Sequence, residues 1–318
     1  MKVKSKPSFT VISPGMLTTI QDCGRFRQAH LGITTGGAAD NNAFMCANQL
    51  LKNSEDAPAL EINFGGLQLI ANSATTIAIT GAQAPISING EVKANWQCHH
   101  LNKNDKLDIG FATSGCRIYL AVSGGFIVPS QFGSTSTVIR EKLGGFDGGA
   151  IKTGQILPIG QTEKIPLNKI NSHYIPKYSN QLNLRVITGY QISSFSRQQV
   201  NKFFASEYQV SSQSDRMGYR LTGPKITSEI SSMYSEGICQ GAIQIPPDGQ
   251  PIVLANDRQT IGGYPKLGSV LSIDLNNLMQ SPQGTKIHFE PISIHCAHTL
   301  LHLAKAKLTN VPLIQGMS

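Results

Sequence analysis

The run Cys116-Arg-Ile-Tyr-Leu-Ala-Val122, which ends at Ser123-Gly-Gly125, shows the pattern that recurs along this chain. Its β-branched, aromatic and aliphatic residues predict a strand, and the two glycines predict a turn after it. With 31 Gly and 16 Pro among 318 residues, the composition favours short strands joined by turns. We therefore predict a mainly β (α+β) fold with a few helices, with further strands at residues 9–12, 66–70, 76–80, 86–88 and 106–109.

Three helices are expected. Over residues 40–51, Asp40 can cap the N-terminus while Phe44, Ala47 and Leu50 fall on one apolar stripe. The other two are expected over residues 196–205 and, with Ser293 as its N-cap, over residues 294–306. No helix is predicted between these last two.

Residues 160–181 are polar and interrupted by proline, which is typical of a linker between domains. We place an N-terminal domain at residues 1–165, the linker at 166–182, and at 183–318 a C-terminal domain that ends in a helix. Strands of the second domain are predicted at residues 183–187, 242–245, 252–254 and 270–273. Both halves place an Asp, Arg and Gly cluster between strands, which fits two related β-barrels.

The net charge is +8, from 27 Lys and Arg against 19 Asp and Glu, but the cations are scattered singly beyond the first six residues. This distribution argues against a nucleic-acid or membrane partner and favours solubility, with attraction of anionic small molecules as a second interpretation. The six cysteines show no Cys-x2-Cys spacing, and neither an apolar signal region before Pro7 nor an 18-residue apolar run occurs. We expect a cytoplasmic protein with reduced thiols.

Several motifs of nucleotide, hydrolase and metal sites are missing. A phosphate loop needs Gly-Lys, which the sequence does not contain, and Gly-x-Ser-x-Gly is also absent. His295, His298 and His302 fall near one helical face, but no carboxylate or second ligand-bearing helix accompanies them. We predict surface histidines there and no metal site.

Polar residues gather on Gly-containing loops between the predicted strands. The first half contributes Asp22 and Arg25, then Gly36-Gly37 ahead of Asp40, with Asn48 and Glu61 on the next elements. The second half contributes Arg216, Arg220, Glu236, Gln244, Asp257, Gln259, Thr260, Gly262 and Gly263.

Each Asp and Arg of these loops is explained on its own by a structural ion pair or a turn cap. Together they are what a pocket for a small polar ligand requires, because paired glycines allow close backbone approach and polar side chains fix the ligand's orientation. The loops therefore predict a ligand site.

These motifs, taken in order, resemble the carboxyltransferase-like family that includes the C subunit of 5-oxoprolinase, allophanate hydrolase subunit 2 and the carboxyltransferase part of urea carboxylase. The resemblance spans about residues 14–289. Two positions depart from it, since Arg27 and Lys52 stand where the family more often has Gly. The matching motifs are Thr19-Ile-Gln-Asp-x-Gly-Arg25, Gly36-Gly37 with Asp40, Ala47-Asn48, Ala59-Leu-Glu61, Ala121-Val-Ser-Gly-Gly125, Ser214-Asp-Arg-Met-Gly-x-Arg-Leu221 and Asp257-x-Gln-Thr-x-Gly-Gly-Tyr-Pro265.

The resemblance implies two cyclophilin-like β-barrel domains and membership in a heteromeric, ATP-dependent 5-oxoprolinase, which converts 5-oxo-L-proline to L-glutamate. It implies ATP with Mg²⁺ in the assembled complex, a cyclophilin-fold partner similar to the B subunit of that enzyme, a lactam-utilisation partner similar to its A subunit, and little activity of the chain alone. No covalently attached biotin is expected, because a Met-Lys-Met attachment site is missing. Two alternatives remain open: the carboxyltransferase subunit of a biotin-dependent urea carboxylase or allophanate hydrolase system, and a non-enzymatic antagonist of a sporulation kinase inhibitor.

The resemblance also suggests roles for the loop residues. Arg216 or Arg220 would hold a carboxylate or phosphate, Asp22 and Asp257 would position a proton or magnesium, and Gln259 with the Gly262-Gly263 backbone would stabilise an oxyanion. We assign catalysis to Asp22, Arg25, Asp40, Asp257 and Gln259, and substrate binding to Arg216, Arg220, Asn48, Glu61, Gln244, Thr260, Gly262 and Gly263.

Overall fold

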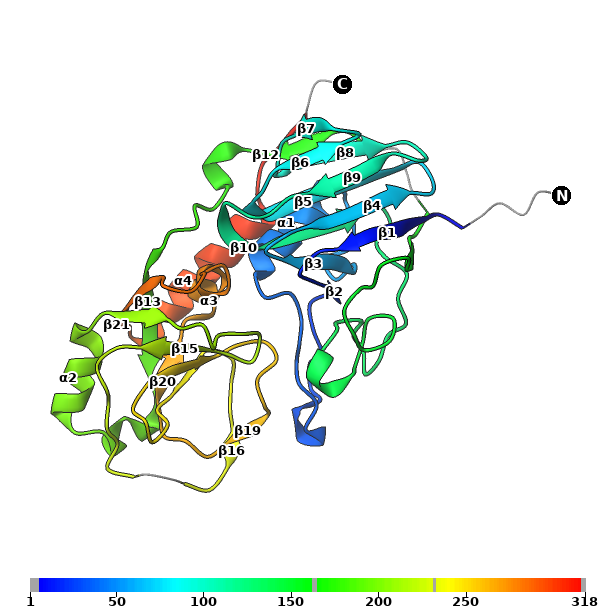
Figure 1. The fold of residues 1–318 in the computed structure, drawn as a ribbon. Helices are drawn as coiled ribbons and strands as arrows, with labels where there is room; N and C mark the ends of the chain where they lie inside the picture. The colour runs from blue at the N-terminus through cyan, green and yellow to red at the C-terminus, as the bar shows by residue number, and fades with distance from the viewer. Residues whose placement is uncertain (1–5, 162–164, 231–232, 316–318) are drawn as a thin grey trace. The chain divides into compact units, whose positions relative to one another are not determined.

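A computed structural model describes residues 6–161, 165–230 and 233–315 (Figure 1). The chain forms two compact units. The first unit comprises the described parts of Met1–Arg25, Gly36–Lys177 and Asn310–Ser318, and the second comprises Phe26–Thr35 and the described parts of Tyr178–Thr309. Both units are built mainly of strands with few helices, so the predicted mainly β class is confirmed.

The units are assembled from separated segments, whereas the expected division at residues 1–165, 166–182 and 183–318 is consecutive. Strand β12 (Asn168–Ile170) lies within the expected linker and pairs with β8 (Gln97–Leu101). The C-terminal strand β22 (Leu313–Gln315) adds to β12 and so belongs to the first unit. Pairing between strands this far apart in sequence leaves no local signal in the residues themselves.

The first unit contains two antiparallel sheets. One has six strands in the order β11-β1-β4-β9-β6-β7, and the other has seven in the order β2-β3-β10-β5-β8-β12-β22. The strands not yet delimited are β1 (Ser8–Pro14), β2 (Leu17–Gln21), β3 (Ala59–Asn63), β4 (Leu67–Ala71), β5 (Thr75–Gln83), β6 (Ile86–Ile88), β7 (Glu91–Lys93), β9 (Lys106–Ile109), β10 (Ser114–Val122) and β11 (Ile156–Pro158). The six strands predicted for this half are all present.

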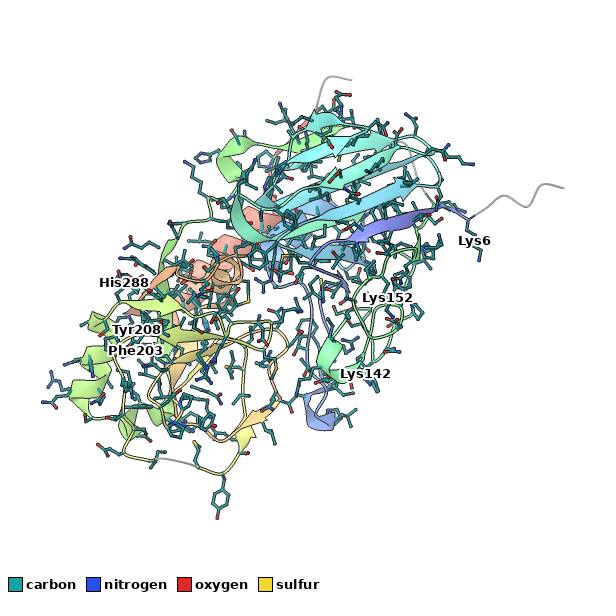
Figure 2. All side chains as sticks on the ribbon, in the orientation of Figure 1. Lys6, Lys142, Lys152, Phe203, Tyr208 and His288 are labelled. Carbon is teal, nitrogen blue, oxygen red and sulfur yellow. The ribbon has the colours of Figure 1, made fainter. Side chains whose placement is uncertain are left out.

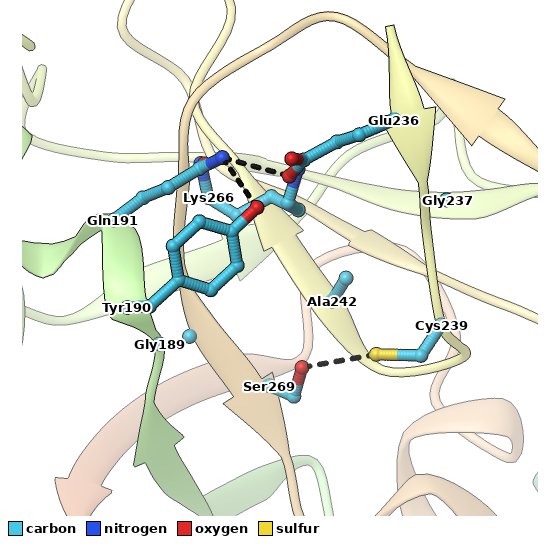
Figure 3. A pocket seen from close by; sticks show the side chains of 10 residues that line it. Gly189, Tyr190, Gln191, Glu236, Gly237, Cys239, Ala242, Lys266 and Ser269 are labelled. Carbon is cyan, nitrogen blue, oxygen red and sulfur yellow. Dashed lines mark hydrogen bonds and ion pairs between the residues drawn. The ribbon is translucent and has the colours of Figure 1, made fainter.

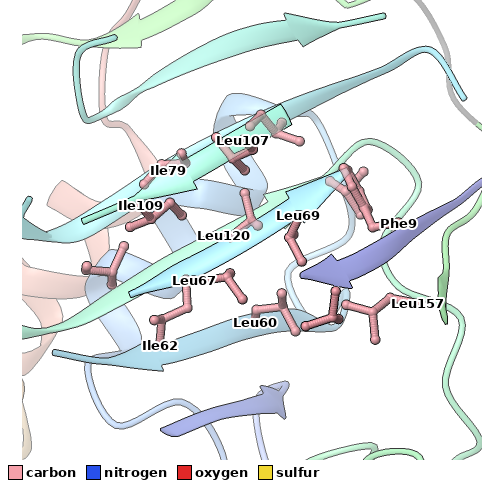
Figure 4. Close-up of a cluster of buried hydrophobic side chains, with 14 of the residues drawn as sticks. Phe9, Leu60, Ile62, Leu67, Leu69, Ile79, Leu107, Ile109, Leu120 and Leu157 are labelled. Carbon is pink, nitrogen blue, oxygen red and sulfur yellow. The ribbon is translucent and has the colours of Figure 1, made fainter. Parts of the chain in front are cut away.

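Alternate residues of both sheets form one apolar core (Figure 4). Leu67 and Leu69 of β4 and Leu60 and Ile62 of β3 are fully buried in it, as the period-two alternation of strands requires. Burial of one such side chain contributes about 1.5–3 kcal/mol, so this core is the main source of the unit's stability.

Helix α1 (Asn41–Leu50) covers part of the seven-stranded sheet and contacts β5 and β10. The Asp40 side chain accepts a hydrogen bond from the Ala43 backbone N–H at 3.1 Å, which is the expected N-cap. Phe44 and Leu50 are fully buried on the face that the sequence indicates. The predicted helix and its cap are confirmed.

The second unit contains a closed barrel in the order β13-β20-β17-β18-β15-β14-β21 and a separate two-stranded sheet. The barrel strands are β13 (Gln181–Thr188), β14 (Tyr208–Val210), β15 (Gly218–Thr222), β17 (Ala242–Gln244), β18 (Ile252–Leu254), β20 (Lys266–Val270) and β21 (Lys286–Pro291). The small sheet pairs β16 (Glu236–Gly237) with β19 (Ile261–Gly262).

Helix α2 (Arg197–Ala205) packs on the barrel through aromatic side chains, and Ser196 caps it. Phe203 stacks on Phe289 of β21 with ring centroids 4.5 Å apart, and its ring centroid lies 5.7 Å from that of Tyr208 of β14. Figure 2 labels Phe203 and Tyr208. This cluster confirms the helix predicted at residues 196–205.

Helix α4 (Ile294–Thr309) agrees with the helix expected at residues 294–306. The Ser293 hydroxyl accepts a hydrogen bond from the Cys296 backbone N–H at 3.2 Å, as its capping role requires. No helix of the described residues is long and apolar enough to cross a membrane.

The strand predicted at residues 270–273 is partly wrong, because β20 ends at Val270 and helix α3 (Ser272–Met279) follows. The Asp274 carboxylate accepts hydrogen bonds from both the backbone N–H and the Nε of Arg185, at 2.9 Å each. This long-range contact favours a turn after Val270. The local run of apolar residues does not indicate the contact, so it predicts a strand instead.

Arg27 and Lys52, the two positions at which the resemblance leads us to expect Gly, both have a left-handed backbone, with φ of 65° and 55°. A side chain at this conformation costs about 1–2 kcal/mol, which glycine avoids. These loops therefore keep the left-handed backbone conformation that glycine favours, although neither position is a glycine.

We predict that Lys52→Gly raises the free energy of unfolding by about 0.5–1 kcal/mol, because relief of backbone strain exceeds the added entropy of the unfolded chain. Chemical denaturation measures the change. Lys103→Gly is the control, since Lys103 is exposed but has no positive φ, and it should destabilise the chain slightly. Equal losses at both positions would contradict the prediction.

Candidate functional site

A cavity of about 270 Å³ lies in the second unit, where β20, the small two-stranded sheet and the 3₁₀ turn Tyr190–Ser194 meet (Figure 3). Small residues form much of its wall, which leaves room for a compact ligand. The lining residues are Gly189, Tyr190, Gln191, Glu236, Gly237, Cys239, Ala242, Lys266, Gly268 and Ser269.

One end of this cavity carries charge. Lys266 on β20 is 9% exposed, and its Nζ forms an ion pair with Glu236 on β16. Gln191 connects them, because its Nε2 donates to Glu236 Oε1 at 2.7 Å while its Oε1 accepts from the Lys266 backbone N–H at 2.8 Å. Lys266 and a hydrogen bond from Tyr190 lower the pKa of Glu236, so that this group stays a carboxylate.

The cavity also presents neutral polar groups. Gln191 Nε2 donates to the Tyr190 hydroxyl at 3.0 Å, and Cys239 Sγ lies 3.2 Å from Ser269 Oγ. The hydrogen bond to Glu236 raises the pKa of Tyr190, which keeps the phenol protonated and able to donate. An ammonium, a carboxylate and hydroxyl donors around a small space can orient one small polar molecule.

Two residues predicted from sequence lie one strand away from this charged end. Gln244 on β17 pairs with Lys266, and Gly262 on β19 pairs with Glu236. A Cβ on Gly262 would lie 2.6 Å from Gln244 Nε2, so a larger residue here would require the Gln244 side chain to move. Gly263, Thr260 and Gln259 are on the same segment, and Gln259 is exposed.

Arg216 and Asp257 form a two-pronged ion pair, with Nε to Oδ2 and Nη2 to Oδ1 both at 2.9 Å. Both side chains are largely buried. Arg220 forms a more exposed ion pair with Asp248 at 2.9 Å. The structure therefore gives each of these arginines a carboxylate partner within the chain.

In the first unit, Asp22 is 7% exposed and accepts hydrogen bonds from the loop that contains Ser134, Thr135 and Ser136. Its carboxylate accepts from the hydroxyls of Ser134, Thr135 and Ser136 at 2.6, 2.9 and 2.5 Å, and from the backbone N–H groups of Thr135 and Gly24 at 2.5 and 2.7 Å. Burial raises the pKa of Asp22, but these hydrogen bonds outweigh it and lower the pKa.

The Arg25 side chain binds backbone carbonyls of the same loop. Its Nε donates to the Gln131 carbonyl at 3.1 Å, and its Nη2 donates to the Ser136 carbonyl at 2.5 Å. The side chain is 1% exposed. Asp22 and Arg25 are thus brought together by the loop that both stabilise.

Asp40 and Glu61 meet around Tyr119, which is fully buried on β10. The Tyr119 hydroxyl donates to Glu61 Oε2 at 2.8 Å and accepts from the Asp40 backbone N–H at 2.7 Å. Arg117 Nε lies 3.7 Å from Glu61 Oε1. Burial, with Glu61 and Asp40 nearby, raises the pKa of Tyr119 well above its ordinary value.

Asn48 joins α1 to the loops that follow it. Its Nδ2 donates to the Ala57 carbonyl at 2.9 Å, and its Oδ1 accepts from Asn53 Nδ2 at 3.0 Å. The sequence motif Ala47-Asn48 is explained by these contacts.

Neither Asp22 nor Asp257 fits a magnesium site, because hydrogen bonds and the Arg216 ion pair engage their oxygens. Among the residues that the structure describes, no group of three or more His, Cys, Asp and Glu side chains is placed to hold a metal ion. His295, His298 and His302 on α4 therefore form no such group.

The sequence motifs predict few of the residues that line the cavity. Among those that they do predict, Glu236 is the charged residue. Lys266 follows directly after the Gly-Gly-Tyr-Pro265 motif, which is the one signal that points to it. Tyr190, Gln191, Cys239 and Ser269 sit in no recognisable motif, since the closing of the barrel brings them together.

Known proteins are similar in sequence to this chain across both of its units. Residues 31–291 match the family described as carboxyltransferase domain, subdomain A and B. The chain is 37% identical over 289 residues to the C subunit of 5-oxoprolinase from Escherichia coli, covering 89% of this chain and 91% of that protein. It is 34% identical to the C subunit of 5-oxoprolinase from Haemophilus influenzae, covering 89% and 90%.

A solved structure, the urea carboxylase of Kluyveromyces lactis, superimposes with a TM-score of 0.92 and 27% identity. The match covers all of this chain and 30% of that one, so the chain spans less than a third of that protein. The chain belongs to the carboxyltransferase subdomain A and B family, and the resemblance inferred from its motifs is confirmed.

We predict that Asp22→Asn lowers the free energy of unfolding by about 2–3 kcal/mol, because an amide oxygen accepts these hydrogen bonds less strongly and an amide N–H faces donors. Since the pKa of Asp22 is lowered on folding, its contribution is full above the ordinary value of 3.8 and is lost as the pH falls through the folded pKa. Denaturation of both proteins from pH 7 to about 2.5 measures this, and a pH-independent difference would contradict it.

We predict that Arg216→Lys lowers the free energy of unfolding by about 1–3 kcal/mol, because lysine keeps the charge but cannot form the two-pronged contact with Asp257. Thermal melting of the isolated chain measures the loss. An unchanged melting temperature together with lost activity of an assembled enzyme would instead place Arg216 on the ligand.

Proposed function

We propose that this chain is one component of an ATP-dependent 5-oxoprolinase, which converts 5-oxo-L-proline to L-glutamate. The observation that carries the proposal is the 37% identity to the C subunit of 5-oxoprolinase from Escherichia coli, across about nine-tenths of both chains. ATP and small organic acids are abundant in the cytoplasm, where we place the enzyme.

The cavity supports this proposal through its size and polarity. 5-Oxoproline is a small, flat ring with one lactam and one carboxylate, and the glycine-lined space beside Lys266 suits such a ring. The Lys266 ammonium can bind the carboxylate or a developing oxyanion, and the Glu236 carboxylate can accept the lactam N–H.

ATP can supply the activation that hydrolysis of this substrate needs. A lactam is an unactivated amide, so its hydrolysis needs either strong stabilisation of an oxyanion or phosphorylation of its oxygen, which turns that oxygen into a leaving group. The chain has no phosphate loop, and its Asp22 and Asp257 oxygens are engaged. We therefore assign the Mg²⁺-bound phosphates to the assembled complex, in which the cyclophilin-fold and lactam-utilisation partners contribute residues.

The alternative of carboxyl transfer to urea has its own support, the TM-score of 0.92 to the Kluyveromyces lactis urea carboxylase. Urea and 5-oxoproline both present a planar amide, so the same cavity can suit either. We favour 5-oxoproline because the identity to the two 5-oxoprolinase C subunits is 37% and 34%, against 27% to the urea carboxylase.

We predict that the chain purified alone forms little glutamate, and that co-expression with its two partner subunits produces ATP-dependent glutamate formation from 5-oxoproline. Lys266→Met in the complex should reduce this rate about 100-fold, because it removes a positioned cation from the cavity. Lys225→Met, at an exposed lysine of the same unit, is the control and should leave it unchanged.

Robust glutamate formation by the single chain would overturn the need for partners. Transfer of a carboxyl group from carboxybiotin to urea by the complex, without activity on 5-oxoproline, would favour the alternative. A streptavidin blot of the chain should be negative, since no biotin attachment is expected.

A further inference from the structure

Three donor groups converge on a single carboxylate, that of Glu236, at the charged end of the cavity (Figure 3). The Lys266 ammonium forms an ion pair with this carboxylate, and Gln191 Nε2 donates to its Oε1 at 2.7 Å. The Tyr190 hydroxyl provides a further hydrogen bond to it. All four residues line the cavity. An ammonium and two neutral donors around one carboxylate are the groups that a binding site for a carboxylate ligand requires.

The donors and the acceptor belong to different parts of the second unit. Lys266 is on β20 of the closed barrel, and Tyr190 and Gln191 are on the turn that follows barrel strand β13. The Lys266 backbone N–H donates to Gln191 Oε1 at 2.8 Å, which fixes the amide with its Nε2 toward the carboxylate. Glu236 is instead on β16, which belongs with β19 to the separate two-stranded sheet. The barrel therefore positions the donors independently of the strand that carries Glu236.

Burial also differs between the two charges. The Lys266 side chain is 11% exposed, whereas that of Glu236 is 31% exposed. The ammonium needs a counter-charge, because a buried charge without a partner is destabilising. The Glu236 carboxylate is closer to water, so it can be hydrated when another carboxylate takes its place. The cavity of about 270 Å³ beside the pair leaves room for a small ligand that carries this group.

We propose that Lys266, Gln191 and Tyr190 form a carboxylate-binding site that Glu236 occupies as an internal counter-ion, and that the carboxylate of a small ligand displaces Glu236 from it. The buried ammonium then keeps a counter-charge throughout the exchange. Binding is weaker than the three donors alone would give, because the ligand competes with Glu236. The identity of the ligand as 5-oxoproline rests on the proposed function, whereas the carboxylate site does not.

The test is a substitution that should strengthen binding. Glu236→Gln in the full chain removes the competing charge, so it should bind cyclopentanecarboxylate, a ring carboxylate without a lactam, about tenfold more tightly than the wild type in titration calorimetry. Glu229→Gln removes an exposed carboxylate of the same unit and is the matched control, which should keep the wild-type affinity. Unchanged or weaker binding by Glu236→Gln, or no binding by either protein, would overturn the proposal.

A second pair of variants guards against a folding defect, since Glu236→Gln leaves the Lys266 ammonium without its counter-charge. Glu236→Asp keeps the charge but shortens the side chain by one methylene, so it should compete less well and also bind the probe more tightly than the wild type. The double variant Glu236→Gln with Lys266→Met removes both charges and should lose the gain in affinity. A double variant that binds as tightly as Glu236→Gln alone would show that Lys266 is not the cation of the site.

The same variants separate this site from the proposed function. If Glu236→Gln binds cyclopentanecarboxylate more tightly but the assembled wild-type complex forms no glutamate from 5-oxoproline, the proposed function fails and the carboxylate site stands. If the complex forms glutamate but neither Glu236→Gln nor Glu236→Asp gains affinity for the probe, the displacement of Glu236 is refuted and the proposed function stands.

Discussion

A charge that leaves water must be compensated by an opposite charge or by hydrogen bonds, and this constraint organises both units of the chain. In the first unit, Asp22 collects five hydrogen bonds, most of them from the segment Ser134–Ser136, and Arg25 holds the carbonyls of the same segment. In the barrel unit, Arg216 and Asp257 neutralise each other, as do Lys266 and Glu236. The loops that join the strands keep their shape because these charges are satisfied.

The same constraint separates structural residues from those that can bind a ligand. Polar side chains on Gly-rich loops suggest one ligand pocket, but many of them complete internal networks, as Glu61 does with Tyr119. The cavity instead combines residues whose polar groups face an open space with glycines that keep that space clear. The paired Lys266 and Glu236 can exchange partners with a ligand, because each can gain a contact for the one it gives up (Figure 3).

Under the proposed function, the cavity takes a small planar amide. The named relatives include 5-oxoprolinase subunits and a urea carboxylase, and 5-oxoproline and urea are both small planar amides. A small space with a cation at one end and hydrogen-bond acceptors nearby suits such molecules better than a long or apolar ligand.

The sequence by itself determined the elements with local causes. The strand at β10 and the helix α1 with its Asp40 cap follow from periodicity and capping, which act within a few residues. The family resemblance follows from the order of the motifs along the chain. Only the tertiary structure decided that β22 joins the first unit, that a helix follows Val270, that Arg216 pairs with Asp257, and that Lys266 meets Glu236. Each of these depends on a contact between residues distant in sequence, whose free energy appears only after the chain has closed on itself.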